Sequence, residues 1–102
     1  MKHAKNMTYN ETTESRELFM YAVNNGELYR QTITPAINNL RKKAIKGVYD
    51  STKAIDLWYM VATEASNRYY KDYGYKFSVA DRYTVAVDMC KYYEDDEVLY
   101  NI

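Results

Sequence analysis

The chain has 102 residues, of which 47% are hydrophobic, and its 14 basic and 14 acidic side chains leave no net charge. This length fits one domain with a real core, and the neutral balance excludes a general electrostatic attraction to nucleic acid or to anionic membranes. The single cysteine excludes an internal disulfide framework, and no apolar run approaches the ~20 residues of a membrane span, so we expect a cytosolic protein.

The polar N-terminal residues 1–12 have no hydrophobic period, which predicts a flexible arm before a single helical domain at 13–102. The first helix should follow Thr13, whose side chain can cap the helix, and Glu14 and Glu17 in the first turns favour that start. Apolar residues then recur at helical spacing until Gly26, where a glycine predicts a helix end.

Residues 27–33 are predicted as a short separate helix or as one arm of a kinked helix. Pro35 is suited to the first position of a new helix, while its ring disfavours helical geometry at Thr34. The helix that begins there should end at Gly47. Its core side is predicted to carry Ile37, Leu40, Ala44 and Val48.

Two more helices follow. Asp50 and Ser78 are suited to cap their starts, and Gly74 to end the first of the two. No segment shows convincing strand alternation and no turn pair suggests a hairpin. The sequence therefore predicts an all-α fold, a compact bundle of four to five helices.

The last helix has apolar residues on two faces. The first face is formed by Val79, Tyr83, Ala86, Val87, Cys90 and Tyr93. The second face, about 120° away, is formed by Val85, Met89 and Tyr92. Such a helix either runs through the middle of the bundle or contacts another subunit, and we expect the second arrangement, a homodimer, because most helices of a small bundle have one side in solvent.

The four consecutive acids at 94–97 predict a solvated helix end, with an acidic contact for a basic partner as the alternative. Adjacent acids on a helix point in different directions, and no other residues complete a ligand shell. We therefore predict no metal site.

Positive charge gathers where the third predicted helix ends, at Arg41, Lys42, Lys43 and Lys46, with Tyr49 just beyond. Lysines there complement the partial negative charge of the helix C-terminus, which is a sufficient structural reason for the cluster. The functional alternative is contact with successive phosphates of a nucleic acid, with Tyr49 stacking on a base.

Thirteen tyrosines make the composition unusual. Tyrosine can line the edge of a core, and it is also favoured at protein interfaces, where aromatic anchors supply much of the binding energy. The candidate anchors are Tyr69, Tyr70, Tyr73 and Tyr75.

The chain offers little for catalysis. Its only histidine, His3, lies in the arm, and Cys90 lies on an apolar helix face, so a nucleophile with a nearby base is missing. No glycine-rich phosphate-binding pattern occurs, and Glu64 with Arg68 has the spacing of a surface ion pair. We predict no catalytic residues, no cofactor and no enzyme.

Two stretches, residues 27–58 (ELYRQTITPAINNLRKKAIKGVYDSTKAIDLW) and residues 77–88 (FSVADRYTVAVD), together resemble a group of small proteins encoded by bacteriophages, prophages and plasmids. The resemblance rests on the order Leu-Tyr, Pro, Asn-Leu, basic run, Gly, Tyr-Asp. It implies a mobile-element origin and a bacterial cytosol, and it supplies no catalytic residues.

These observations favour a non-enzymatic accessory protein that binds a protein partner, and the resemblance adds a host defence or nucleic-acid-handling complex as the target. One alternative is a nucleic-acid-binding module that uses the basic residues at 41–49. The other is a self-associating structural protein.

Overall fold

The structure is a computed structural model and describes residues 8–94. Within that range the chain forms α1 (Thr13–Val23), then α2 (Gly26–Leu28), a π-helical turn (Tyr29–Ile33) and α3 (Thr34–Ile45) as one continuous helix, then α4 (Ser51–Tyr73) and α5 (Val79–Tyr93). No strand occurs among these residues, so the all-α prediction is confirmed for them. None of the helices within 8–94 has the length and apolarity needed to cross a membrane.

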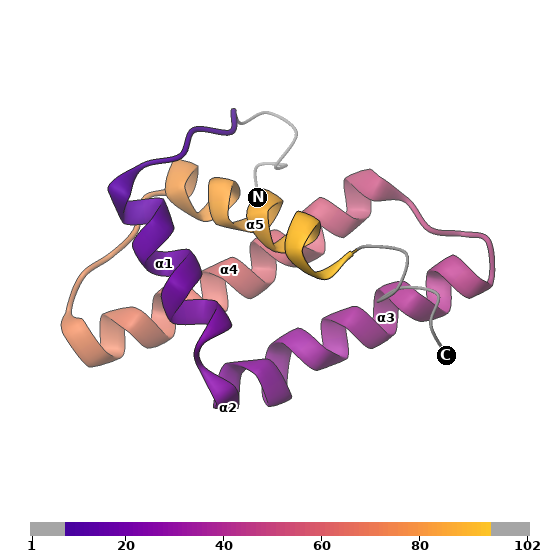
Figure 1. Cartoon of the computed structure of the whole chain (residues 1–102), viewed down its shortest axis with the longest axis horizontal. Helices are drawn as coiled ribbons and strands as arrows, with labels where there is room; N and C mark the ends of the chain where they lie inside the picture. Colours follow the sequence, from indigo (N-terminus) through magenta and orange to yellow (C-terminus); the bar gives the residue numbers. More distant parts are fainter. Residues whose placement is uncertain (1–7, 95–102) are drawn as a thin grey trace.

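The long helix α4 extends through the molecule, and the other helices pack around it (Figure 1). Both α1 and α5 contact α4 and each other, while α3 and the π turn contact α4 from another side. Trp58, near the middle of α4, is fully buried. The other large hydrophobic side chains that are fully buried come from α1, α2, the π turn and α5: Leu18, Leu28, Ile33, Val85 and Met89.

Helix caps follow the sequence at most ends. The side chain of Asp50 accepts a hydrogen bond from the Thr52 N–H at 2.9 Å, and that of Ser78 accepts from the Asp81 N–H at 3.0 Å, as predicted. At the start of α1 the cap is Thr12 rather than Thr13, because Thr12 and Ser15 exchange side-chain and backbone hydrogen bonds in a capping box.

Two of the three glycines take the left-handed conformation expected at a helix end. Gly47 and Gly74 both have φ of 75°. The prediction for Gly26 is wrong, because α1 ends at Val23 and Gly26 is the first residue of α2. The cause is Asn25, whose side-chain oxygen accepts from the Leu28 N–H at 2.9 Å and starts a new helix.

α3 begins at Thr34 with Pro35 in its first turn, as predicted, but it continues directly from the π turn, so residues 27–33 are one arm of an interrupted helix and not a separate helix. Thr34 has helical dihedrals, φ −59° and ψ −44°, and its N–H bonds to the carbonyl of Tyr29, five residues back. A proline ring clashes with the carbonyl four residues before it in a regular helix, and a π turn just upstream relieves such a clash. The same turn brings Leu28 and Ile33, five residues apart, into the core together.

The predicted core side of α3 holds for Ile37 and Leu40, which are buried, and in part for Ala44, which is half-buried. Val48 is 62% exposed and not in the core. The reason is Gly47, whose left-handed turn carries the chain away from the helix before Val48.

The described part of the predicted arm, residues 8–12, lies against α5. The Tyr9 hydroxyl donates to Asp88 at 2.9 Å, and the Asn10 N–H donates to the Thr84 hydroxyl at 3.0 Å. The Thr12 hydroxyl donates to Asp81 at 2.8 Å. These bonds connect residues 8–12 to α5, and residues 1–7 of the predicted arm lie outside the described residues.

The prediction that Val85, Met89 and Tyr92 of the last helix form a contact face for a second subunit is wrong for two of the three residues. Val85 and Met89 have no exposed surface, because α5 is covered by α1 on one side and by α4 on another. Only Tyr92 of that face is exposed, at 59%. The helix therefore follows the other arrangement considered above, in which both apolar faces are used within one chain. Of the predicted acidic end, only Glu94 lies among the described residues.

Candidate functional site

The two groups of predicted binding residues lie at opposite ends of α4. The lysines at 42–46 end α3, directly before the turn that leads into α4, whereas Tyr69, Tyr70 and Tyr73 occupy the last turns of α4. A helix of 23 residues is about 35 Å long. A small partner segment therefore cannot contact both groups at once, and each must be judged as a separate surface.

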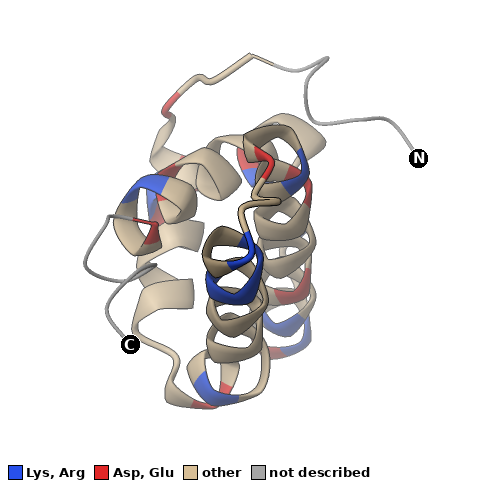
Figure 2. Ribbon diagram, turned by 90° about the vertical axis from the view of Figure 1, so that its right-hand side faces the viewer, with Lys and Arg blue, Asp and Glu red and all other residues tan. Residues whose placement is uncertain are grey.

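The basic end is a ridge formed by Lys42, Lys43 and Lys46, here named the lysine ridge. Lys42 and Lys46 are exposed, and Lys43 is half-buried, as is the neighbouring Arg41. Figure 2 shows the basic positions of α3 gathered toward the end that leads into α4. The cations thus lie near the helix C-terminus, where the partial negative charge of the free carbonyls favours them.

Tyr49 does not join the lysine ridge as a stacking platform. It is half-buried, and its hydroxyl donates a hydrogen bond to the Glu94 carboxylate. The indole N–H of Trp58 donates to the same carboxylate. One carboxylate thereby joins the α3–α4 turn, the middle of α4 and the end of α5, so Tyr49 has a structural role.

Cys90 lies beside this carboxylate, and residues 8–94 contain no histidine that could act as its base. Burial, and after it the Glu94 carboxylate, raise the pKa of the Cys90 thiol to about 12. At neutral pH the thiol is therefore protonated, and only the thiolate is an effective nucleophile. Cys90 is therefore a half-buried thiol that stays protonated.

The other end of the molecule carries an aromatic cluster formed by Tyr21, Tyr69, Tyr73, Tyr75 and Phe77. Tyr69 is its hub, with ring centroids 4.6 Å from Tyr73, 4.8 Å from Phe77 and 5.1 Å from Tyr21. Tyr75 packs edge-on against Phe77 at 4.9 Å. Phe77 is buried, while Tyr73 is 67% and Tyr75 46% exposed. The cluster is therefore anchored in the core and open to solvent on its outer side.

Local sequence explains how these rings meet. Tyr69 and Tyr73 are four residues apart on α4, which places them on one side of the helix. Gly74 then ends α4 in the left-handed conformation, and the turn brings Tyr75 and Phe77 back over the same side. Tyr70 lies outside the cluster, with the Lys76 ammonium 5.1 Å from its ring centroid.

Two of the four tyrosine hydroxyl groups in the cluster contact a carboxylate. Tyr21 donates to Asp72 at 3.0 Å, and Tyr69 makes a long contact of 3.4 Å with Glu17. Burial, and then Asp72, raise the pKa of Tyr21; desolvation, and then Glu17, raise the pKa of Tyr69. Both hydroxyls therefore stay protonated at neutral pH and act as donors.

Two solvent-open hollows flank the contact between Tyr69 and Glu17. The acidic hollow, about 220 Å³, is lined by Thr13, Glu14, Glu17, Tyr69, Tyr75 and Phe77. The amide hollow, about 510 Å³, shares Glu17 and Tyr69 and adds Tyr21, Tyr73, Asn24 and Asn25. Within the described chain, no lysine or arginine lines either one.

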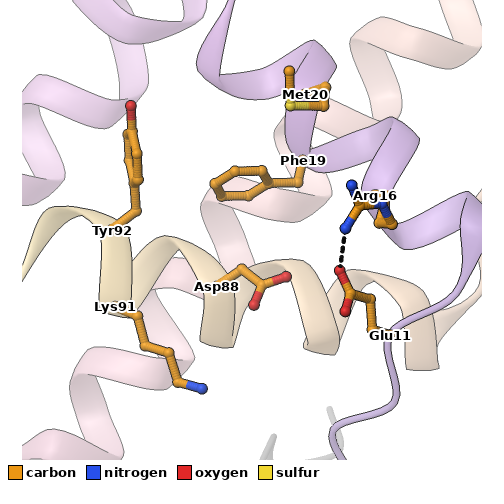
Figure 3. Close-up of a pocket in the computed structure, with 7 residues that line it drawn as sticks. All are labelled: Glu11, Arg16, Phe19, Met20, Asp88, Lys91 and Tyr92. Carbon is orange, nitrogen blue, oxygen red and sulfur yellow. Dashed lines mark hydrogen bonds and ion pairs between the residues drawn. The ribbon is translucent and has the colours of Figure 1, made fainter.

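A third hollow, about 440 Å³, lies between α1 and α5 (Figure 3). Its floor is Phe19 packed edge-on against Tyr92, with ring centroids 5.6 Å apart. Its rim has charges of both signs, including the Glu11–Arg16 ion pair at 2.8 Å. The mixed rim gives this hollow no charge preference for a partner.

Metal binding has no support among residues 8–94, where no three His, Cys, Asp or Glu side chains are placed to share an ion. The predicted surface pair is present: the Arg68 guanidinium contacts Glu64 at 3.0 Å, and it also bonds to Glu27 and Gln31.

No protein-family model, curated protein or solved structure matches this chain. Its function is therefore inferred from its own surfaces. Sequence reasoning found Tyr69, Tyr73 and Tyr75 but missed Tyr21 and Phe77. The only signal for Tyr21 was its aromatic type, because its approach to α4 depends on how α1 packs.

Proposed function

We propose that this protein is a non-enzymatic binding protein whose aromatic cluster engages a protein partner. The observation that carries the proposal is the cluster itself, in which exposed Tyr73 and Tyr75 are fixed by ring contacts to Tyr69 and buried Phe77. Rigid, partly exposed aromatic rings lose little conformational freedom on binding, and tyrosine is enriched among the residues that dominate interface energies.

The resemblance of residues 27–58 and 77–88 to small phage, prophage and plasmid proteins supports a mobile-element accessory protein in the bacterial cytosol. In that setting the partner is a host or phage protein, for example a component of a defence or nucleic-acid-handling complex. The protonated, half-buried Cys90 agrees with a role that requires no nucleophile.

Affinity capture of the tagged protein from bacterial lysate, with and without nuclease, tests this proposal. We expect a discrete protein that remains bound after nuclease treatment. Recovery of nucleic acid alone, lost on nuclease treatment, would contradict it.

The lysine ridge supports a second candidate, a nucleic-acid-binding module. The favouring observation is that Lys42 and Lys46, four residues apart on α3, are both exposed. Three lysines that each neutralise one phosphate of duplex DNA predict that log K falls with log salt with a slope of about −2.7. Binding to a DNA duplex across a salt series, with the variant Lys42→Glu, Lys43→Glu, Lys46→Glu as control, decides this: affinity unchanged in the variant would exclude the ridge.

A further inference from the structure

The acidic hollow combines an aromatic wall with two carboxylates. Tyr69 and Tyr75 each pack edge-on against Phe77, at 4.8 and 4.9 Å, and close one side. Glu14 and Glu17, from the first turns of α1, line the other side, and both are exposed. Within residues 8–94 neither glutamate has an ion-pair partner.

We propose that this hollow binds a lysine or arginine side chain of a basic segment in the protein partner. The inference rests on the proposed function and names the chemistry of the segment that the aromatic cluster would engage. Carboxylates attract the cationic head group, and aromatic faces attract a cation through their quadrupole. The rings also cover the apolar stem of such a side chain.

The chain itself pairs tyrosine rings with cations at three other places. The pairs, with distances of 5.1 to 5.7 Å from the cation to the ring centroid, are Lys76 over Tyr70, Arg82 over Tyr59 and Lys91 over Tyr9. In the described residues, no lysine or arginine lies over Tyr69, Tyr75 or Phe77. The hollow thus has the same chemistry as these pairs, without a cation from its own chain.

One opposing charge has to be weighed. The N-terminus of α1 has a partial positive charge equivalent to about +0.5, which disfavours a cation nearby. Two full negative charges on Glu14 and Glu17 exceed it. In addition, the capping box of Thr12 and Ser15 already satisfies backbone N–H groups at this end.

The adjoining amide hollow explains why the ligand is a segment of chain and not an isolated cation. It begins at the shared Glu17 and Tyr69, and it offers the amides of Asn24 and Asn25 beside the rings of Tyr21 and Tyr73. Side-chain amides can both donate to and accept from a peptide backbone. A basic residue in the acidic hollow would therefore place its neighbours over these asparagines.

The test is a titration followed by amide NMR of the full chain, with a short synthetic peptide of alternating glycine and arginine as probe. A matched peptide with glutamine in place of arginine is the reference. We expect the arginine peptide to shift the resonances of Glu14, Glu17, Tyr69, Tyr75 and Phe77, and the glutamine peptide to leave them unchanged.

Two charge-matched variants sharpen the result. Glu14→Gln with Glu17→Gln should weaken arginine-peptide binding about fivefold or more, because it removes both carboxylates of the hollow. Glu11→Gln with Glu27→Gln changes the net charge equally, on glutamates outside the hollow, and should have little effect. Equal weakening in both variants, or shifts centred on the hollow between α1 and α5, would overturn the proposal.

Two further outcomes separate the alternatives. Shifts at the acidic hollow that grow with protein concentration in the absence of peptide would overturn the proposal in favour of a second copy of this chain as the occupant. Capture of the partner by the Glu14→Gln, Glu17→Gln variant at full yield, with loss of capture in Tyr73→Ser, would overturn this inference and leave the proposed function standing.

Discussion

Gly74 and Gly26 differ in backbone conformation, so the same substitution should have different effects at the two positions. Gly74 ends α4 at φ 75°, with open space around the position of an added Cβ. Gly26 begins α2 without a left-handed φ, and an added Cβ would be 3.4 Å from the flexible end of Arg30. The cost at Gly74 is therefore backbone strain alone.

We predict that Gly74→Ala lowers the free energy of unfolding by about 1 to 2 kcal/mol, because alanine is strained in the left-handed region. Gly26→Ala should leave it unchanged or raise it by up to about 1 kcal/mol, since alanine restricts the unfolded chain and favours helix. Urea unfolding of both variants measures this. Equal destabilisation of the two would mean that the backbone at Gly74 is not left-handed in solution.

The raised pKa values of Cys90 and Tyr93 predict that the protein becomes less stable at alkaline pH. Burial is the first cause that raises both pKa values to about 12, from 9.0 for the thiol and 10.0 for the phenol. The folded state thus holds these protons more tightly than the unfolded state does. Their contribution to stability is complete below pH 9 and is lost as the pH rises from 9 toward 12.

The measurement is the urea midpoint of unfolding at pH 8, 9, 10 and 11, which we expect to fall above about pH 9. Cys90→Ala should reduce the fall between about pH 9 and 10, where the unfolded thiol ionises before the phenol does. A wild-type midpoint that stays constant over this range would contradict the raised pKa values of the half-buried Cys90 thiol and of Tyr93.

At the residue scale, the sequence predicted features that depend on a few neighbouring residues. The caps Asp50 and Ser78 and the left-handed Gly47 and Gly74 are of this kind. Gly26 was mispredicted because two local signals compete there, a glycine that can end a helix and an asparagine at position 25 that can start one. Which of them prevails depends on the packing of Leu28 into the core.

At the scale of elements, Arg68 connects α4 to the α2 segment and the π turn. Its guanidinium contacts Glu64, Glu27 and Gln31 at 2.8 to 3.0 Å, and its side chain is 20% exposed. Arg16, in contrast, bonds to Glu11 alone within residues 8–94, and its side chain is 71% exposed. Substitutions of the two arginines can therefore be compared, because each removes one cation but only Arg68 connects separate helical segments.

We predict that Arg68→Met lowers the free energy of unfolding by about 0.5 to 1 kcal/mol, whereas Arg16→Met changes it by no more than a few tenths. The difference in free energy of unfolding between the two variants should become smaller in about 1 M salt, because salt screens exposed ion pairs. Thermal or urea unfolding of both variants, in low salt and in about 1 M salt, measures this difference. An Arg68→Met protein as stable as Arg16→Met would show that this network contributes nothing.

The π turn marks the limit of prediction from helical periodicity. Pro35 correctly signalled an interruption, but a proline allows either a new helix or a distorted continuous one. Leu28 and Ile33 are five residues apart, a spacing that a regular helix would place about 140° apart. The π turn between them changes this angle, and only the packing of the whole bundle reveals that both are buried.

At the scale of the whole molecule, the decisive arrangement is the distance between the lysine ridge and the aromatic cluster. The sequence identified both groups, because lysine and tyrosine are recognised by type and spacing. It did not predict that they lie at opposite ends of α4, since that depends on the direction in which each helix packs. The charge count shows a similar separation, with +9 and −5 in residues 1–53 and +5 and −9 in 54–102, or +4 and −4.

The separation makes the central claim testable with single substitutions. Tyr73 in the aromatic cluster and Tyr92 in the hollow between α1 and α5 are similarly exposed, at 67% and 59%. Serine at either position removes a largely solvent-facing ring, so stability should change little in both variants, and urea unfolding checks this.

The most direct measurement is the yield of nuclease-resistant partner captured by the wild type, Tyr73→Ser and Tyr92→Ser. We predict that Tyr73→Ser reduces the captured amount about tenfold or more, as expected for an aromatic anchor, and that Tyr92→Ser retains it. Retention by Tyr73→Ser together with loss in Tyr92→Ser would contradict the account and move the binding surface to the hollow between α1 and α5.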